Sequence, residues 1–478
     1  MLLVGLFRST DPELWRDEVS SWSAATRDLD QLFGMLDNVD ASNGTYYVIL
    51  HFWAALFGDS VFALRLLSAL AMAGAAAFTA LIGQRLFNSR LAGLSAGLLL
   101  VTVPTVSRFA QEIRTYAVVT CAVAAACWLL LRALDRPGVL RWSGYALTMA
   151  LAGACHLVSL SSLAGQLVLV LGHWWSRRRE PGAAHVLWQF PLAVLATLAA
   201  VSPVAVLGDR QSARQLGWLP APSVHDLVYL WHDLFYAPRV SYAFALLALP
   251  ALLHPRFVRG AVQALLLAVL PALVVWQLSQ GTTSYFIERY LLFTLPALAV
   301  LAGAGIAAVA ALLSRRVPRR AAVAAALALV AVPLVVGAPR QQALRNTFSH
   351  GDRDFRGGAE VIAAGYRPGD GLVTAGGNQA WAMVEAGLTF YLPGSVRPTP
   401  MFVERDAVRN EDLYARPCPV AEPCLGDAPR TWLVTIGKSA DPYEGLPGDQ
   451  IQALQKAYVP TQTRQLPGLT VSLLVRKA

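Results

Sequence analysis

The chain has 478 residues, of which 55% are hydrophobic and only 14% are charged. Soluble domains carry charge on about a quarter of their residues, so this composition excludes an ordinary soluble protein and predicts an α-helical, multi-pass membrane protein. The net charge of +9 does not indicate nucleic-acid binding, because the arginines stand in short clusters between apolar stretches, as the positive-inside rule predicts for cytoplasmic loops.

The first seven residues form an apolar stub that precedes a predicted external loop over residues 8–59. The stub is too short for a membrane span, which needs about 20 apolar residues, and too short for the apolar region of a signal peptide. An external first loop requires a preceding span. We therefore expect a truncated first helix, whose native form extends upstream by about a dozen residues.

The first external loop carries an adjacent pair of carboxylates, Asp17 and Glu18, between Trp15 and Trp22. Neighbouring positions on a helix do not face each other, so we expect one member, Asp17, to act chemically. The alternative is a solvated acidic pair at a helix N-terminus. We predict an amphipathic helix after the pair and an aromatic helix over residues 46–58, both lying along the membrane surface.

Ten further apolar stretches are long enough to span a bilayer or nearly so, which gives about eleven spans with the truncated first helix. The arginine clusters between them fall on one side, which is cytoplasmic by the positive-inside rule. Every loop with unusual polar residues is then external. The predicted spans lie near 60–83, 91–107, 115–134, 142–158, 160–176, 185–207, 241–255, 260–279, 287–313 and 321–339.

Charged residues also stand at the external ends of two spans, where the positive-inside rule predicts few arginines. Arg108, Glu112 and Arg114 flank one junction, and the segment 288–290 (Glu-Arg-Tyr) opens a later span. One interpretation is an ion pair of Glu112 with a nearby arginine that closes a turn. The other is that Arg114 and Arg289 bind a phosphate, since a guanidinium binds its oxygens bidentately.

After residue 340 the sequence becomes polar and rich in glycine and proline, which predicts a small extracytoplasmic α/β domain over residues 340–478. Residues 1–339 then form the membrane module. We expect strands at Gly371–Ala375, Thr431–Ile436 and Leu469–Arg476, and a helix at Ala380–Tyr391.

Two groups of cysteines differ in their surroundings. Cys418 and Cys424 lie in the polar tail, where an oxidising compartment favours a disulfide between them, although two reduced thiols are the alternative. Cys121, Cys127 and Cys155 lie in apolar stretches and are expected to pack as small hydrophobic residues.

Histidines supply weaker candidates. His232 lies in an external loop near Tyr236, where it contacts a sugar or acceptor or simply belongs to a polar loop with aromatic anchors. His156 stands near the outer end of a span and either faces a cavity or bonds to a neighbouring helix. Gly93 and Gly97 form a small-residue contact between helices.

Taken in order, these features resemble the membrane glycosyltransferases of the C superfamily, in particular family 39, which includes protein O-mannosyltransferases and aminoarabinose transferases of lipid A. The resemblance covers the membrane part well and the tail only loosely. Relatives commonly have His-Pro-Pro where residues 42–45 read Ser-Asn-Gly-Thr, which puts the acceptor in doubt more than the reaction. The matching positions are Asp17-Glu18, Tyr46-Tyr47, Phe57-Gly58-Asp59, Arg65 with Ser68, residues 111–116 (Gln-Glu-Ile-Arg-Thr-Tyr) and Glu288-Arg289-Tyr290.

The resemblance implies transfer of a mannose-like or arabinose-like sugar from a polyprenyl-phosphate donor to an acceptor hydroxyl, with inversion. Asp17 is the expected general base, and Glu18, the other residue of the catalytic pair, either supports Asp17 or orients the acceptor. We expect no cofactor, although the scheme leaves a divalent metal possible. The phosphate-binding residues are then Arg114, Arg289, Arg108 and Tyr116, and the acceptor or substrate contacts are Glu112, Tyr46, Tyr47, Glu288, Tyr290 and His232.

The expected partners are the lipid-linked donor, an envelope glycan, glycolipid or protein acceptor, and the bilayer of a bacterial plasma membrane. Two other classes stay open. A lipid or glycolipid transporter also needs many spans and charges at membrane depth, but such folds often contain inverted repeats, which this sequence does not show convincingly. A noncatalytic scaffold is the third possibility.

Overall fold

The computed structural model describes residues 1–351, 353–374 and 377–478 and divides the chain into two compact units. One, here called the helical unit, contains residues 1–7, 40–46 and 64–343. The other, the α/β unit, contains residues 8–39, 47–63 and 344–478. The predicted domain boundary after residue 339 stays a prediction.

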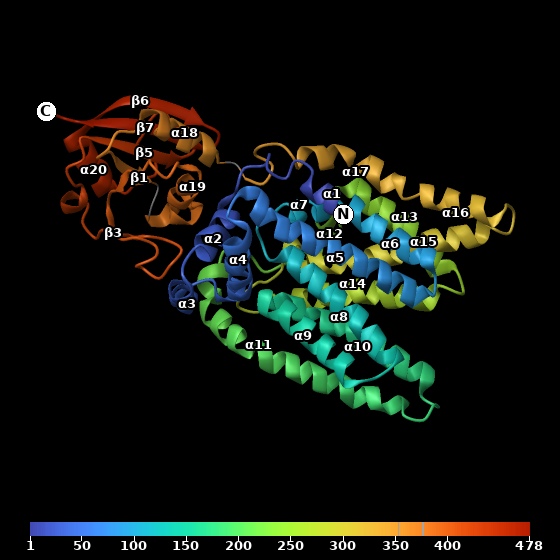
Figure 1. Cartoon of the computed structure of the whole chain (residues 1–478). Coiled ribbons are helices and arrows are strands. Elements are labelled where there is room, and N and C mark those ends of the chain that lie inside the picture. Colours follow the sequence, from blue (N-terminus) through green and yellow to red (C-terminus); the bar gives the residue numbers. More distant parts are fainter. Residues whose placement is uncertain (352, 375–376) are drawn as a thin grey trace. The chain divides into compact units, whose positions relative to one another are not determined.

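The helical unit consists of long apolar helices joined by short turns (Figure 1). Helix α4 (Gly44–Phe57) begins in this unit and continues in the α/β unit. With η marking a 3-10 helix, the others are α1 (Leu2–Leu6), η1 (Ala41–Asn43), α5 (Val61–Phe87), α6 (Arg90–Thr102), α7 (Pro104–Ala110), α8 (Tyr116–Asp135), α9 (Val139–Cys155), η2 (Leu157–Ser161), α10 (Ser162–Arg177), η3 (Ala183–His185), α11 (Val186–Leu216), α12 (Val224–Phe235), α13 (Pro238–Leu253), α14 (Val258–Leu278), η4 (Glu288–Thr294), α15 (Leu295–Leu313), α16 (Arg319–Ala328) and α17 (Ala331–Ala343).

Among the described residues, seven helical segments are long and apolar enough to cross a bilayer, or nine if two bent pairs each count as one span. The sequence predicts about eleven spans, and that number is not confirmed. The pair α6–α7 bends by 71° and the pair α12–α13 by 95°. Each second helix starts with a proline, Pro104 or Pro238, and the residue before a proline avoids the helical conformation.

Small residues allow α15 to pack closely against α6 and α13. A Cβ added at Gly303 would collide with the backbone of Ala96, and one at Gly305 would collide with the carbonyl oxygen of Leu247. Gly93 fits against the Ala80 carbonyl in the same way, which confirms its predicted role as a helix contact. Glycine is needed at these points because the backbones touch.

The α/β unit contains a five-stranded sheet of order β2-β1-β5-β7-β6. Strand β1 pairs in parallel with β2 and β5, whereas β7 pairs in antiparallel fashion with β5 and β6. A separate antiparallel pair joins β3 to β4. The strands are β1 (Gly371–Thr374), β2 (Thr399–Pro400), β3 (Val403–Arg405), β4 (Arg416–Pro417), β5 (Arg430–Ile436), β6 (Tyr458–Leu466) and β7 (Leu469–Arg476).

Helices cover both faces of this sheet (Figure 1). Gly358 of α18 lies against Val471 of β7 and against Leu388 of α19, while Leu474 of β7 belongs to the core that includes Leu454 of α20. Residues 471 and 474 differ by an odd number and therefore point to opposite faces. The helical elements of the tail are α18 (Phe355–Gly365), η5 (Gly377–Ala382), α19 (Val384–Tyr391), η6 (Glu422–Cys424) and α20 (Gly448–Ala457).

The predicted elements of the tail are present. The predicted strands correspond to β1, β5 and β7, and the predicted helix corresponds to η5 and α19. Ala375, the predicted last residue of the first strand, lies outside the described residues. A disulfide joins Cys418 to Cys424 as predicted, and the three cysteines of the helical unit are free thiols, with Cys127 and Cys155 buried.

The first loop also contributes two helices to the α/β unit, α2 (Arg16–Ala25) and α3 (Leu29–Asn38). Helix α3 begins with a capping box in which Asp28 and Gln31 bond reciprocally to the backbone. Helix α2 packs on α19, where Trp22 meets Phe390 edge to face at 5.1 Å between ring centroids. Helix α2, which carries the predicted catalytic pair, is therefore held by the tail.

Candidate functional site

An aromatic cluster in the helical unit supports the predicted arginines. The rings of Tyr116, at the start of α8, and Tyr290, in η4, stack with 6.2 Å between centroids. The His156 ring lies edge to face with Tyr290 at 4.5 Å and 5.8 Å from Tyr116. Helices α8 and η4 pack together, so rings from three separate parts of the chain form one aromatic group, here called the Tyr116–Tyr290 floor.

Two arginines lie beside these rings, Arg114 in the turn before α8 and Arg289 in η4. The Arg114 guanidinium lies 6.0 Å from the Tyr116 ring, and the Arg289 guanidinium lies 5.8 Å from the Tyr290 ring. Both are close enough to His156 to interact with it electrostatically. The two arginines, which the sequence analysis paired only by their topological positions, therefore belong to one cluster.

Arg108 extends this cluster toward a second tyrosine. Its guanidinium donates to the Tyr236 hydroxyl at 2.6 Å, and its Nε lies 3.4 Å from a carboxylate oxygen of Glu112. The charge of Arg289 also reaches Arg108. Arg340 lies over the Tyr236 ring at 4.0 Å. We call Arg108, Arg114, Arg289 and Arg340, with Tyr116, Tyr236, Tyr290 and His156, the arginine cluster.

Glu112 is fully buried, and its backbone carbonyl accepts a hydrogen bond of 2.6 Å from Ser68. Its pairing with Arg108 is the turn-closing ion pair that the sequence analysis kept as an alternative. The arginine cluster thus contains one buried carboxylate, and Glu288 stands at the start of η4. Four guanidiniums exceed these two carboxylates, so the cluster is suited to an anion.

Two members of the cluster, Tyr236 and Arg340, were not among the predicted phosphate-binding residues. Tyr236 has a left-handed backbone conformation, with φ of 56°, and ends α12 just before the α12–α13 bend. Arg340 lies in the last turn of α17, directly after the last predicted span. The bend signalled by Pro238 was the available clue to Tyr236, since it turns a loop tyrosine back toward α7.

The predicted catalytic pair lies in the first turn of α2, in the α/β unit. Asp17 is partly exposed and lies 3.2 Å from the Nε of Arg16. Glu18 is fully buried, with one carboxylate oxygen 3.8 Å from Nδ1 of the equally buried His350. The two neighbours thus have different environments, and their catalytic roles stay a prediction.

Further contacts fix the start of α2 on the tail. The buried Glu13 forms an ion pair of 3.0 Å with Arg356, and the Tyr391 hydroxyl accepts a hydrogen bond from the backbone N–H of Leu14 at 3.3 Å. Burial raises the pKa of Glu13 above its ordinary value, although Arg356 opposes the effect. Burial likewise raises the pKa of Tyr391 to about 12.

The remaining residues that were predicted to contact the substrate or acceptor differ in how deeply they are buried. Tyr46 and Tyr47 are both fully buried. His232 is partly buried, and its Nδ1 lies 2.8 Å from the Ser241 hydroxyl in the turn of the α12–α13 pair. Their assignment to substrate or acceptor binding stays a prediction, as does that of Glu112, Glu288 and Tyr290. No group of three or more His, Cys, Asp or Glu side chains arranged for a metal ion occurs among the residues that the structure describes.

Comparisons with known proteins show which family and which solved structures this chain is similar to. Residues 45–206 match the family described as dolichyl-phosphate-mannose-protein mannosyltransferase. The fold is similar to that of ArnT from Cupriavidus metallidurans, solved bound to undecaprenyl phosphate (TM-score 0.58, 16% identity) and in the apo state (TM-score 0.56, 17% identity). Each likeness covers 99% of this chain and 96% of that chain. No curated protein matches the sequence.

The chain is therefore a multi-pass membrane protein with a fold similar to that of ArnT over nearly its whole length, and its residues 45–206 match the mannosyltransferase family. The predicted resemblance is confirmed to this extent.

Proposed function

We propose that this protein is a membrane glycosyltransferase that moves a sugar from a polyprenyl-phosphate donor to an acceptor hydroxyl on the extracytoplasmic side. The observation that carries the proposal is the gathering of Arg114 and Arg289 beside His156 on the Tyr116–Tyr290 floor. The ligand class agrees with the undecaprenyl phosphate bound to ArnT, which has a similar fold.

The arginine cluster suits a phosphate because its positive charges are fixed before any ligand arrives. Tyr236 accepts a hydrogen bond from Arg108 at 2.6 Å, and aromatic rings lie beside Arg114 and Arg289. Charge that develops on the leaving phosphate is then stabilised without reorganisation of the side chains, which is an effective form of electrostatic catalysis. Arg108 and Tyr116 complete the proposed phosphate-binding set.

The proposed reaction needs one proton acceptor. The acceptor hydroxyl attacks the anomeric carbon while the bond from that carbon to the phosphate oxygen breaks, and the polyprenyl phosphate leaves with the bonding electrons. Asp17 takes the proton of the hydroxyl as general base, and Glu18 stabilises the helix around it through His350. Attack on the face opposite the phosphate inverts the anomeric configuration. A mannose-like or arabinose-like sugar is the proposed cargo.

The proposal is tested by following consumption of synthetic polyprenyl-phosphate mannose and polyprenyl-phosphate arabinose by the purified full chain. We expect Arg114→Ala and Arg289→Ala to weaken donor binding, whereas the matched control Arg316→Ala, in the turn after the C-terminal end of α15, leaves it unchanged. Translocation of the lipid with no sugar transfer by the unaltered protein would favour a transporter and overturn the proposal.

A further inference from the structure

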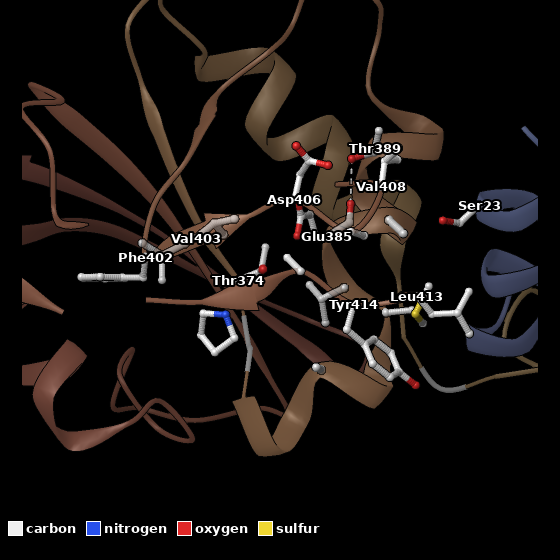
Figure 2. A pocket seen from close by; sticks show the side chains of 18 of the residues that line it. Ser23, Thr374, Glu385, Thr389, Phe402, Val403, Asp406, Val408, Leu413 and Tyr414 are labelled. Carbon is white, nitrogen blue, oxygen red and sulfur yellow. Dashed lines mark hydrogen bonds between the residues drawn. The ribbon is translucent and has the colours of Figure 1, made fainter. Parts of the chain in front are cut away.

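A cavity lies in the α/β unit, whereas the arginine cluster belongs to the helical unit. The cavity has a volume of about 390 Å³ and is lined by residues of α2, α3, α19 and the segments around β1 and β3 (Figure 2). Small-molecule sites in proteins range from about 300 to 1,000 Å³, so the cavity can hold one or two sugar rings. None of the predicted site residues lines it.

The wall of the cavity is largely apolar. Strands β1 and β3 contribute Val373 and Val403, and the turn between β2 and β3 contributes Met401 and Phe402. Trp22 of α2 lines the cavity as well and adds an aromatic ring. Apolar and aromatic surface of this kind packs against the C–H face of a sugar ring and gives little affinity for a small inorganic ion.

A few polar groups interrupt this wall. Figure 2 shows Glu385 and Asp406 beside each other, with Thr374 and Thr389 nearby. The Thr389 hydroxyl donates to the backbone carbonyl of Glu385 at 2.8 Å and so is not used by the carboxylate of Glu385. Among the residues that the structure describes, no side chain donates to that carboxylate.

The carboxyl group of Glu385 is buried and would be stabilised by hydrogen bonds from a ligand. Burial and the neighbouring charge of Asp406 raise the pKa of Glu385, because a carboxylate there is poorly solvated and repelled. Asp406, in contrast, has an ion pair with the exposed Arg409 at 3.5 Å. A hydroxyl donates to a carboxylate and accepts from a carboxylic acid, so a polyol satisfies Glu385 in either protonation state.

A fixed cation stands at the same cavity. Arg27, which lines it, is 3% exposed and donates to the backbone carbonyl of Asp412 at 2.6 Å. Its Nε and Nη1 have no hydrogen-bond partner among the described residues. Both nitrogens are themselves buried, so the polar groups left to a ligand are the carboxylates and hydroxyls of the wall. Such groups around an apolar wall are the pattern expected for a neutral sugar with several hydroxyl groups.

We infer that this cavity, between α2–α3 and the β1–β3–α19 part of the tail, binds a neutral saccharide unit of the acceptor, with Glu385 as its principal hydrogen-bonding group. The inference rests on the proposed glycosyltransferase function and gives the acceptor a chemical class, a hydroxylated glycan. Helix α2 carries both Asp17 and the cavity residue Trp22, so a sugar bound here is held by the helix that bears the proposed base.

The test measures saccharide binding by saturation-transfer NMR on the full chain in detergent, with methyl α-mannopyranoside as the neutral probe. Methyl 2-amino-2-deoxy-glucopyranoside is the cationic probe. We expect saturable binding of the neutral sugar that weakens by about fivefold or more in Glu385→Gln, since a charge-assisted hydrogen bond is replaced by a weaker, neutral one. Val408→Trp, which fills the rim of the cavity, abolishes binding, while Glu444→Gln, an exposed control outside the cavity, leaves it unchanged.

Three outcomes overturn the inference: no saturable binding to the unaltered protein, equal binding by Val408→Trp, or binding of the amino sugar alone. The last outcome would identify a cation site. Thermal unfolding of each variant shows whether lost binding reflects lost folding. Donor consumption is measured separately. Saccharide binding without sugar transfer would therefore contradict the proposed function, while the cavity would still be identified as a carbohydrate-binding site.

Discussion

The guanidinium of Arg16 lies over the indole ring of Trp381, 5.1 Å from the ring centroid. Arg353 lies against the same ring at 5.0 Å, and Arg16 pairs with Asp17 at 3.2 Å. The tail therefore contacts, through one aromatic residue, the arginine that flanks the proposed base.

Replacing Trp381 by alanine removes this support for Arg16. A cation–π contact at a partly exposed site contributes about 0.5–1 kcal/mol, so we expect kcat to fall by about two- to fivefold with an unchanged KM for the donor. Trp381→Phe is expected to restore most of the rate. Trp175→Ala removes the ring beside Arg178 in the helical unit and serves as the control. A rise in donor KM without a change in kcat would rule out a positioning role for Trp381.

Tyr236 offers a test of the arginine cluster that leaves every charge in place. Tyr236→Phe keeps the ring beside Arg340 but removes the hydroxyl that accepts from Arg108. A less restrained Arg108 is expected to raise the donor KM several-fold without affecting unfolding temperature. Tyr242→Phe, on the exposed face of α13, is the matched control. An unchanged donor KM would show that the hydroxyl does not organise the cluster.

Gly305 tests the close packing of α15. A side chain there meets the backbone of α13, and backbone cannot move aside as a flexible side chain can. We expect Gly305→Ala to lower the yield of folded, detergent-soluble protein sharply. Gly138→Ala, where a Cβ meets nothing within 4 Å, should match the unaltered protein in size-exclusion chromatography. Equal yields for both variants would contradict the helix packing described here.

The unaltered protein and Glu385→Gln are expected to differ in stability by an amount that depends on pH. Because burial and Asp406 raise the folded-state pKa of Glu385 above 4.5, the folded state binds its proton more tightly than the unfolded state does. The favourable contribution is full below about pH 4.5 and is lost as pH rises through the folded-state pKa. Glu385→Gln should therefore raise the unfolding temperature at pH 8, and the difference should shrink toward pH 4. A difference independent of pH would refute this explanation.

The apolar helices and the strands β1, β5 and β7 were predictable because each is a buried apolar run with turn residues at its ends. Strand β6 was not, since almost every residue from Val459 to Gln465 is exposed and its polar sequence carries no alternation. The bend at Pro104 divides the predicted span 91–107, whereas the bend at Pro238 joins the predicted span 241–255 to a helix in the preceding predicted loop. Hydropathy alone does not distinguish a straight span from a broken one.

The candidate site was predictable in part for a related reason. Arg114 and Arg289 were predictable because external arginines are rare beside spans. The contacts of Tyr236 and Arg340 were not, since Pro238 indicates a bend but not which side chains the bend brings together. The same holds for Trp381. Its contact with Arg16 joins positions far apart in the chain, and an isolated tryptophan in a polar tail gives no signal of such a partner.

The most direct test of the central claim is the transfer rate of Asp17→Asn on a synthetic polyprenyl-phosphate sugar, measured beside Asp30→Asn, an exposed control in the first turn of α3. Loss of a general base predicts a fall of about 10²- to 10⁴-fold in kcat, with donor KM and unfolding temperature unchanged, and no effect in the control. Transfer by Asp17→Asn at the rate of the unaltered protein would contradict the account.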